Sequence, residues 1–391
     1  MPQPASFLRR PQRVFFRRAL LQIHLWAGIV LSIYVALIGV TGSILVFRSE
    51  LTRWLHLKPW QDVATVDRPA DAGAVIRNVR AAYPGRHIVS LTAPEPSQPV
   101  FVVLVEGRGA VRVACHPLDG RLLGEFPRQP TWLDSIDDLH ANLWAHRSGR
   151  VVNGAAAGGL LLMAATGIVL WWRGIRKWTL GLTVDLRRGW RRINFDLHSA
   201  AGFWTLLIIS FWAVSGIYFA WPRQVFLAVN SVSRIVSARP PAIIVPAQDT
   251  ENLPDVRELV DRAERIDPGT RFAGIDFPYS SRAPLGVLLE RGNGIGREYV
   301  DTVFFDPYSG AYLTTWRYGV NQTLGDWVIW LMVPLHFGTY WGLTFKLLWA
   351  MVGLALPTLA ATGLIMYWNR VLRRKWRQMV NLAQGGSRLA R

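Results

Sequence analysis

Four histidines lie beside the long apolar stretches of this 391-residue chain, one next to each stretch. They are His24, His140, His198 and His336. A neutral imidazole is a common ligand of transition metals, and it is also an ordinary hydrogen-bonding group at a membrane surface. The type of residue does not separate these two roles, so the spacing of the four histidines has to do so.

The spacing repeats in the two halves of the chain. Aligning His198 with His24 superimposes a Ser-Gly pair on a Thr-Gly pair near the far end of the stretch. Aligning His336 with His140 superimposes two Thr-Gly pairs, again without a gap. The four pairs are Thr41-Gly42, Ser215-Gly216, Thr166-Gly167 and Thr362-Gly363. A unit of span, polar block and span therefore occurs twice in the same direction, which favours one shared role for the histidines.

The four apolar stretches are long enough to cross a hydrocarbon core of roughly 30 Å as helices that rise about 1.5 Å per residue. They are predicted at 20–47, 151–172, 199–221 and 342–368. No small-residue cleavage site follows the first stretch, so we expect it to be retained rather than removed as a signal sequence. The expected fold is an α-helical membrane protein with four transmembrane helices in two tandem repeats.

The charge distribution predicts the orientation of the spans. Nearly all of the formal net charge of +18 comes from three short flanks, at 1–18, 173–196 and 369–391. Short basic segments stay in the cytoplasm, so both termini are expected there and the two large polar blocks on the other side. A basic chain can also indicate nucleic-acid binding. Here topology accounts for the charge, and no nucleic-acid partner is expected.

This topology brings equivalent histidines to the same side of the membrane. Two imidazoles from facing helices give a six-coordinate, low-spin haem iron that is suited to electron transfer. We therefore expect two haems per chain, one held by His24 with His198 and one by His140 with His336. The sequence has no Cys-x-x-Cys-His motif, which excludes covalent attachment and leaves haem b as the expected cofactor.

The two outer histidines come well before the start of their spans. A continuous helix would carry His140 roughly 15 Å beyond the membrane, so we expect interfacial segments at 136–150 and 327–341 that fold back toward the bundle. The exact pairing stays open, with His146 as an alternative outer ligand. The remaining histidines have no counterpart in the other half and are expected to be surface or structural residues. They are His56, His87 and His116.

Each polar block has the pattern of a small α+β domain with an antiparallel sheet. The first block has helical spacing at 72–82, followed by strand-like runs at 87–91, 100–105 and 110–114. The second block repeats this order, with a helix at 255–266 and strands at 274–277, 285–289 and 300–305. We expect two small domains, at 48–135 and 222–326.

Other redox and nucleotide chemistries lack support in the sequence. Cys115 is the sole cysteine, so neither an intramolecular disulfide nor a dithiol mechanism is available. There is no Walker sequence, and no dinucleotide-binding glycine motif follows a strand. Electrons for a redox reaction would therefore come from another molecule.

The chain resembles the PepSY-associated transmembrane family. The resemblance rests on His24-Leu25-Trp26-Ala27-Gly28, Leu139-His140 and Trp171-Trp172-Arg173 in the spans. The blocks resemble PepSY domains through the turn Asp306-Pro307-x-x-Gly310, whose aspartate is replaced by His116 in the first block. Bacterial inner-membrane members of this family include siderophore-iron reductases with two b-type haems. The resemblance therefore implies an inner-membrane location, periplasmic PepSY-like domains, haem and ferric reduction.

These expectations combine into one functional hypothesis. The protein would be a di-haem transmembrane electron-transfer protein that reduces periplasmic ferric complexes, above all ferric siderophores, and releases Fe(II). Its electron donor would be a cytoplasmic protein or a quinol. The alternative is a haem-free, membrane-anchored regulatory protein that binds partners through its PepSY-like domains. Transport of the chelate itself is disfavoured, because the sequence offers no pair of discontinuous helices and no buried acidic relay.

Charged residues near the histidines have two interpretations each. Four arginines before the inner histidines are candidates for contacts with haem propionates, or they are topology signals only. They are Arg17, Arg18, Arg191 and Arg192. Four aspartates before the outer histidines would bind a cationic chelate or released iron, or they would stabilise the starts of helices. They are Asp134, Asp137, Asp138 and Asp326. No residue is assigned a catalytic role.

The expected organisation consists of tails, spans, interfacial segments and outer domains. In chain order these are a basic cytoplasmic tail (1–19), a span (20–47), a periplasmic PepSY-like domain (48–135), an interfacial segment (136–150), a span (151–172), a basic cytoplasmic loop (173–198), a span (199–221), a second periplasmic PepSY-like domain (222–326), an interfacial segment (327–341), a span (342–368) and a basic cytoplasmic tail (369–391).

Overall fold

The computed structural model describes residues 15–55, 59–60, 62–64, 71–95, 98–106, 110–126, 130–236, 243, 254–291, 300–338 and 341–373. His56 and most of the two basic tails lie outside these residues. The chain forms two compact units. The helical unit comprises Met1–Phe47, Asp134–Leu227 and Pro334–Arg391, and the sheet unit comprises Arg48–Leu133 and Ala228–Val333.

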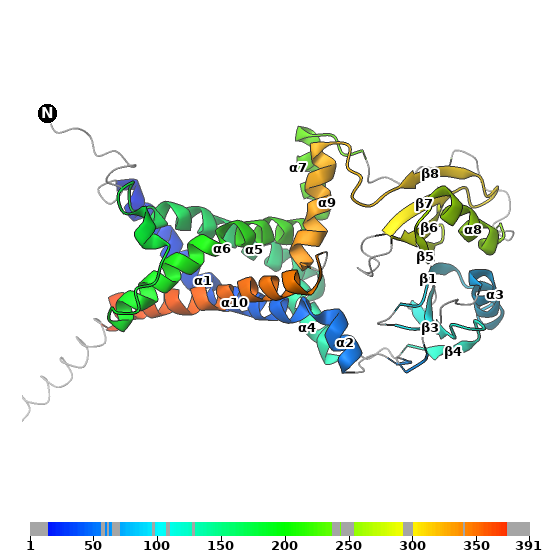
Figure 1. Ribbon diagram of the computed structural model, residues 1–391, viewed down its shortest axis with the longest axis horizontal. Coiled ribbons are helices and arrows are strands. Elements are labelled where there is room, and N and C mark those ends of the chain that lie inside the picture. The colour runs from blue at the N-terminus through cyan, green and yellow to red at the C-terminus, as the bar shows by residue number, and fades with distance from the viewer. Residues whose placement is uncertain are drawn as a thin grey trace, which may run out of the picture. The chain divides into compact units, whose positions relative to one another are not determined.

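Four long apolar helices form the helical unit and run alongside one another (Figure 1). They are α1 (Phe15–Leu45), α5 (His146–Trp171), α6 (Trp190–Ala220) and α10 (Gly342–Tyr367). Each is long and apolar enough to cross a bilayer. Large apolar side chains point outward, and Ile33 and Leu207 are each 82% exposed. Because apolar surface of this extent needs an apolar solvent, the chain is a membrane protein.

The packing of the bundle places α1 opposite α6. Both α1 and α6 pack against α5 and α10. Small residues let α1 and α10 approach closely, as is common between membrane helices. A Cβ added to Gly39 would lie 2.6 Å from the Gly353 carbonyl oxygen, and the Ser43 hydroxyl donates to the Ala350 carbonyl at 3.0 Å. The two diagonal pairs, α1 with α6 and α5 with α10, therefore face each other across the bundle.

The third span starts earlier than the sequence predicted. Helix α6 begins at Trp190 rather than at 199, so the loop before it is shorter and contains only the 3-10 turn η2 (Trp178–Gly181). The polar residues at the start of α6 do not interrupt it, because Arg192 donates to Asp196 one turn later at 2.9 Å. At the other end of the chain, α10 continues into the π-helical turn η4 (Trp368–Leu372).

Four shorter helices connect the spans to the rest of the chain. They are α2 (Arg48–Trp54), α4 (Trp132–Asn142), α7 (Pro222–Val232) and α9 (Leu324–Phe337). Two of them, α4 and α9, overlap the expected interfacial segments at 136–150 and 327–341 and carry the outer histidines. The other two were not predicted. Both are difficult to recognise in a sequence, because α2 has only 7 residues and only one residue separates α7 from α6.

The sheet unit contains one antiparallel sheet with the strand order β4-β3-β2-β1-β5-β6-β7-β8. The first block supplies β1 (Ile88–Thr92), β2 (Phe101–Val105), β3 (Val111–Cys115) and β4 (Leu122–Glu125). The second block supplies β5 (Arg271–Asp276), β6 (Leu285–Glu290), β7 (Val300–Phe305) and β8 (Tyr312–Trp316). The blocks join where β1 pairs with β5, with Leu91 opposite Ile275.

The structure adds a connection between the two expected small domains that the sequence did not predict. Each block has its own four strands, but the two sets form a single continuous sheet. Without the β1–β5 pairing, both strands would be edges with unpaired backbone groups, and joining them satisfies these groups. The outermost strands, β4 and β8, were not predicted, because neither contains a buried residue and so neither has a buried face that marks it as a strand.

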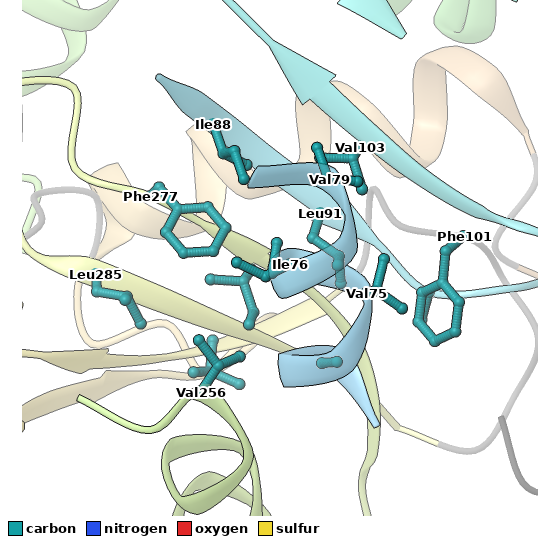
Figure 2. Packing of buried hydrophobic residues seen from close by; sticks show 14 of the residues in the cluster. Val75, Ile76, Val79, Ile88, Leu91, Phe101, Val103, Val256, Phe277 and Leu285 are labelled. Atoms are coloured by element: carbon teal, nitrogen blue, oxygen red, sulfur yellow. The ribbon is translucent and has the colours of Figure 1, made fainter. Parts of the chain in front are cut away.

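Two helices, α3 (Ala72–Ala82) and α8 (Val256–Ile266), supply apolar side chains to the core of the sheet unit. Figure 2 shows Val75, Ile76 and Val79 of α3 against Leu91 and Phe101 of the sheet. Alternation explains why one face is buried, since every second residue of β2 is fully enclosed. Both helices start at an aspartate whose carboxylate accepts a backbone N–H two residues later, at 3.0 Å in each case.

The turns before β4 and β8 have the same form with different residues. In the second block, the Asp306 carboxylate accepts the backbone N–H groups of Tyr308 and Ser309, at 2.8 and 3.0 Å. In the first block, His116 Nδ1 accepts the backbone N–H of Leu118 at 3.3 Å. His116 thus takes over the acceptor role of the aspartate that it replaces, which gives it a structural role.

Candidate functional site

The four histidines of the helical unit meet as two pairs. His24 on α1 and His198 on α6 have ring centroids 6.4 Å apart, with an angle of 90° between the rings. His140 on α4 and His336 on α9 have centroids 6.3 Å apart, with an angle of 67°. Both pairs are the ones expected from the sequence. We call them the inner pair (His24 and His198) and the outer pair (His140 and His336).

The inner pair follows directly from the packing of the spans. His24 and His198 both lie within long helices, near the ends where α1 and α6 begin. Since α1 and α6 are diagonal in the bundle, each ring reaches the bundle interior from the opposite side. No loop or short helix is needed to bring these two residues together.

His140 reaches the outer pair through a sharp reversal of the chain. Helix α4 ends at Asn142, and the next two residues, Leu143 and Trp144, have φ values of 51° and 54° before α5 starts at His146. The Asn153 side chain of α5 donates to the His140 and Ala141 carbonyls, at 2.8 and 3.0 Å. These carbonyls at the end of α4 lack helical partners, so Asn153 both satisfies them and fixes the reversal.

Two indole groups bind the backbone directly before His336. The Leu335 carbonyl, next to His336 at the end of α9, accepts from Trp349 Nε1 at 2.7 Å and from Trp212 Nε1 at 3.3 Å. The Phe219 ring lies against the imidazole, with 4.9 Å between centroids. Gly338 then turns the chain with a φ of 65°. The outer pair therefore depends on tryptophans of α6 and α10 as well as on α9 itself.

Each of the four imidazoles also contacts a hydroxyl group through Nδ1. The distances are 3.0 Å from His24 to Thr166, 2.9 Å from His140 to Thr41, 2.9 Å from His198 to Thr362 and 2.7 Å from His336 to Ser215. These hydroxyls are the ones in the repeated Thr-Gly and Ser-Gly pairs. Every contact joins two elements of the same half of the chain.

The glycines of these pairs make room for the imidazoles. A Cβ added to Gly42 would lie 3.0 Å from Cε1 of His140. The same test gives 3.4 Å between Gly167 and His24, and 3.5 Å between Gly363 and His198. Gly216 differs, since its added Cβ would meet Ala157 instead. Three of the four pairs thus combine a hydroxyl that binds the ring with a glycine that lets the ring lie against the helix.

The ring separations fit one metal atom between the two imidazoles of each pair. An imidazole nitrogen binds a transition metal at about 2.0 Å and lies about 1.1 Å from the ring centre, so two such rings have centres roughly 6.2 Å apart. Within the described residues, no group of three or more His, Cys, Asp or Glu could hold a metal by itself. Two protein ligands per site suit a cofactor that supplies its own equatorial nitrogens, as haem does.

Two of the four arginines expected near the inner pair, Arg17 and Arg192, have protein partners instead. Arg17 donates to the carbonyls of Val169, at 2.9 Å, and of Leu170 and Trp172 at the end of α5. Arg192 pairs with Asp196. Arg18 and Arg191 are exposed. Asp196 and the charge of Arg173 were not predicted as parts of the site. The Asp196 side chain is 3% exposed, and the Arg173 guanidinium lies 3.8 Å from its carboxylate.

Two of the aspartates expected near the outer pair, Asp326 and Asp138, make structural contacts. The Asp326 carboxylate is 3% exposed and accepts the backbone N–H groups of Val236, Gln322 and Thr323. It therefore anchors the start of α9, which is the helix-stabilising interpretation rather than the iron-binding one. Asp138 accepts from Asn142 at 2.8 Å, and Asp134 and Asp137 also have interaction partners.

The remaining candidates are not part of either pair. His146 and His87 are exposed, and the outer pair forms without His146. Cys115 is fully buried in β3, and its burial raises the pKa of the thiol to about 12. A thiol with this pKa is protonated and unreactive at neutral pH, so Cys115 is a core residue.

The hydroxyl contacts are the part of the site that the sequence analysis missed. In the sequence, the Thr-Gly and Ser-Gly pairs served only to align the two halves. The sequence contains the relevant pattern, because the hydroxyl residues repeat between the two halves in the same alignment as the histidines. Assigning each hydroxyl to its histidine requires knowing which helices are neighbours, and the sequence does not show this.

Comparison with known proteins agrees with this architecture. A search of curated proteins finds no match to the chain. The family model described as the PepSY-associated TM region matches residues 21–370, which includes all four histidines and their hydroxyl partners. This protein therefore belongs to the PepSY-associated transmembrane family.

Proposed function

We propose that this protein is a di-haem transmembrane electron-transfer protein that reduces periplasmic ferric complexes, above all ferric siderophores, and releases Fe(II). The observation that carries the proposal is the facing of two histidines at each of two places, with ring centroids 6.4 and 6.3 Å apart. His24 and His198 would hold one haem b, and His140 and His336 the other. A bis-imidazole haem supplies an iron that exchanges one electron without a change of ligands.

The distance between the two pairs supports a role across the membrane. His24 and Thr41, the hydroxyl partner of His140, are both on α1. At a rise of about 1.5 Å per residue, the two positions are roughly 25 Å apart along the helix, which is close to the thickness of the hydrocarbon core of about 30 Å. Two sites at this spacing would lie near opposite faces of the membrane, so that each would be within reach of a partner on its own side. The Phe219 ring packs against His336 and gives the outer pair an apolar neighbour.

The finer architecture is part of the same proposal. We propose that the chain consists of two tandem repeats, because equivalent histidines make equivalent hydroxyl contacts in both halves. Each repeat would contribute a PepSY-like domain of four strands and one helix to the sheet unit. The short basic flanks favour an inner-membrane protein with both termini in the cytoplasm and the sheet unit in the periplasm. Reporter fusions at residue 391 and within 59–64 test this orientation.

The charged groups at the inner side have a defined place in the proposal. Arg18 and Arg191 are exposed and free to contact haem propionates, whereas Arg17 and Arg192 would have to exchange their present partners. A lipid bilayer is the environment of the spans, and a cytoplasmic protein or a quinol is the proposed electron donor. The sheet unit would provide the surface for the ferric complex.

The first experiment is the visible spectrum of the purified protein, oxidised and reduced, with haem quantified as the pyridine haemochrome. About two low-spin b haems per chain are expected. The double variant H24A/H198A should retain one haem, and H140A/H336A should retain the other. His146→Ala is the matched control, because His146 is exposed and lies next to the outer site in sequence without belonging to a pair. Its haem content should equal that of the unaltered protein.

A chain that contains no haem, although produced with haem available, would contradict the proposal and favour the regulatory alternative. The substrate is tested separately, by mixing the reduced protein with ferric siderophores without oxygen. Each ferric ion takes one electron, so the reduced spectrum should disappear as Fe(II) is trapped by a ferrous chelator. Reduced haem that no ferric complex reoxidises would leave the haem assignment intact and refute the substrate.

A further inference from the structure

The four hydroxyl groups that contact the histidines share one geometry that goes beyond simple packing. Each hydroxyl oxygen lies close to a backbone carbonyl four residues earlier in its own helix. The distances are 2.8 Å for Thr41, 2.8 Å for Thr166, 2.9 Å for Ser215 and 2.7 Å for Thr362. Each oxygen also lies 2.7 to 3.0 Å from an imidazole Nδ1. The single hydroxyl proton can serve only one of these two contacts.

The short distance to the carbonyl decides where that proton lies. Two oxygen atoms at 2.7 to 2.9 Å need a proton between them, since without one their lone pairs repel each other. The hydroxyl therefore donates to the carbonyl, and its oxygen is left as an acceptor for the imidazole. The imidazole must then carry its proton on Nδ1. The same reasoning applies to all four histidines, in four different pairs of helices.

We propose that Thr41, Thr166, Ser215 and Thr362 are positioning residues that hold all four histidines in the Nδ1–H tautomer. This tautomer leaves the Nε2 lone pair free, so the hydroxyls determine which nitrogen is available as a ligand. The inference rests on the proposed function for its purpose, because a free Nε2 matters only if a metal binds it. The tautomer itself does not depend on the presence of haem.

The hydroxyl contacts and the imidazole pairs connect the bundle in two different directions. His24 on α1 binds Thr166 of α5, and His198 on α6 binds Thr362 of α10. Each of these contacts joins neighbouring helices within one half of the chain. The imidazoles, by contrast, face each other between the halves. A change of helix packing within one half would therefore move a ligand, which links the integrity of each half to the site.

The hydroxyls should also influence the reduction potential. An imidazole that donates from Nδ1 is a stronger electron donor through Nε2, and it stabilises the more highly charged ferric iron. Removing the acceptor should raise the potential of the affected haem. It should also reduce haem affinity, by roughly 10- to 100-fold if these hydroxyls behave like other groups that hydrogen-bond to metal ligands.

The first test compares Thr166→Val with Thr166→Ser. Valine has nearly the same shape as threonine but no hydroxyl, whereas serine keeps the hydroxyl. Thr205→Val is the control, since Thr205 is a buried threonine of α6 whose hydroxyl donates to Ala201 at 2.7 Å and contacts no histidine. In a redox titration of the haem spectrum, T166V should shift one of two transitions to a higher potential. T166S and T205V should leave both transitions unchanged.

The second test reads the tautomer without haem. Protein with ¹⁵N-labelled histidine, prepared without haem in lipid nanodiscs, should give Nδ1–H signals from the four paired histidines, each assigned by its loss in a His→Ala variant. In T166V the Nδ1–H signal of His24 should be lost or shifted. Nε2–H signals from these four histidines would overturn the proposal, as would equal potentials in T166V and the unaltered protein.

The two tests separate this proposal from the assignment of function. Unaltered protein without haem would refute the functional proposal, while the ¹⁵N signals would still decide the tautomer. Protein with two haems whose potentials are insensitive to T166V would refute the role of the hydroxyls and leave the di-haem function standing. A shift in T205V as large as that in T166V would show that general packing, not the contact with Nδ1, sets the potential.

Discussion

Replacing Gly338 with alanine should damage the outer pair specifically, although Gly338 contacts neither imidazole. Gly338 follows the last residue of α9, two positions after His336, and its φ of 65° lies in the left-handed region. A Cβ at this position would lie 2.3 Å from Cδ1 and 2.4 Å from Cγ of Trp349. Both distances are far below van der Waals contact, so either the backbone or the indole must move.

The cost can be estimated from three contributions. A left-handed backbone costs an alanine about 1 kcal/mol relative to glycine. Overpacking against a buried ring costs about 1–3 kcal/mol. If Trp349 moves, its 2.7 Å hydrogen bond to the Leu335 carbonyl is lost, which adds about 1 kcal/mol. The expected destabilisation is therefore about 4 kcal/mol, and it falls on the segment that positions His336.

Gly342→Ala provides the matched control. Gly342 also has a left-handed φ, 79°, but a Cβ there would meet nothing within 4 Å. It should cost only the backbone contribution of about 1 kcal/mol. Thermal unfolding followed by circular dichroism and haem content after purification would compare the two variants. Gly338→Ala should lose the outer haem and keep the inner one, whereas Gly342→Ala should keep both. Equal stability and equal haem content in the two variants would refute the steric argument.

Two further predictions concern the sheet unit. Asp326→Asn should destabilise the protein by about 3 kcal/mol, because the amide cannot accept all three backbone N–H groups that the carboxylate now satisfies; unfolding in denaturant that is unchanged from the unaltered protein would argue against this anchoring role. Cys115 should resist maleimide at pH 8 in the folded protein, since with a pKa of about 12 roughly one thiol in ten thousand is ionised at that pH; labelling as fast as in detergent-denatured protein would contradict its burial.

The sequence predicted the local structure well where one signal dominated. Continuous apolar stretches marked α1, α5, α6 and α10, and the bounds of α5 and α10 differ from the predicted ones by at most five residues. The helix at 72–82 coincides with α3, because its apolar spacing lies between Asp71, which caps it, and Tyr83-Pro84-Gly85, which ends it. In these segments, propensity, periodicity and end signals agree with one another.

Prediction failed where pairing between distant segments decides the outcome. No local sequence feature of β1 or β5 predicts that the two strands pair with each other. Each strand could equally form the edge of its own sheet. The early start of α6 also depends on a side-chain contact, the ion pair of Arg192 with Asp196. A window of hydropathy reports these residues only as polar, and therefore places the start of the helix after them.

The four histidines of the candidate site were predictable from the sequence, and the contacts that orient them were not. The repeated register of His24, His140, His198 and His336 was enough to pair them, because a two-fold arrangement of equivalent spans leaves few other ways to bring equivalent residues together. The same register contained the hydroxyls, but a Thr-Gly pair in a membrane helix is equally expected from close packing alone. Only the geometry assigns one hydroxyl to each ring. Since every hydroxyl bonds within its own half while every imidazole faces the other half, the two sets of contacts constrain each ring from both sides. A substitution that preserves the fold but removes one hydroxyl should therefore leave the histidine in its pair and change which ring nitrogen carries the proton, so the tautomer is a more direct observable than haem occupancy.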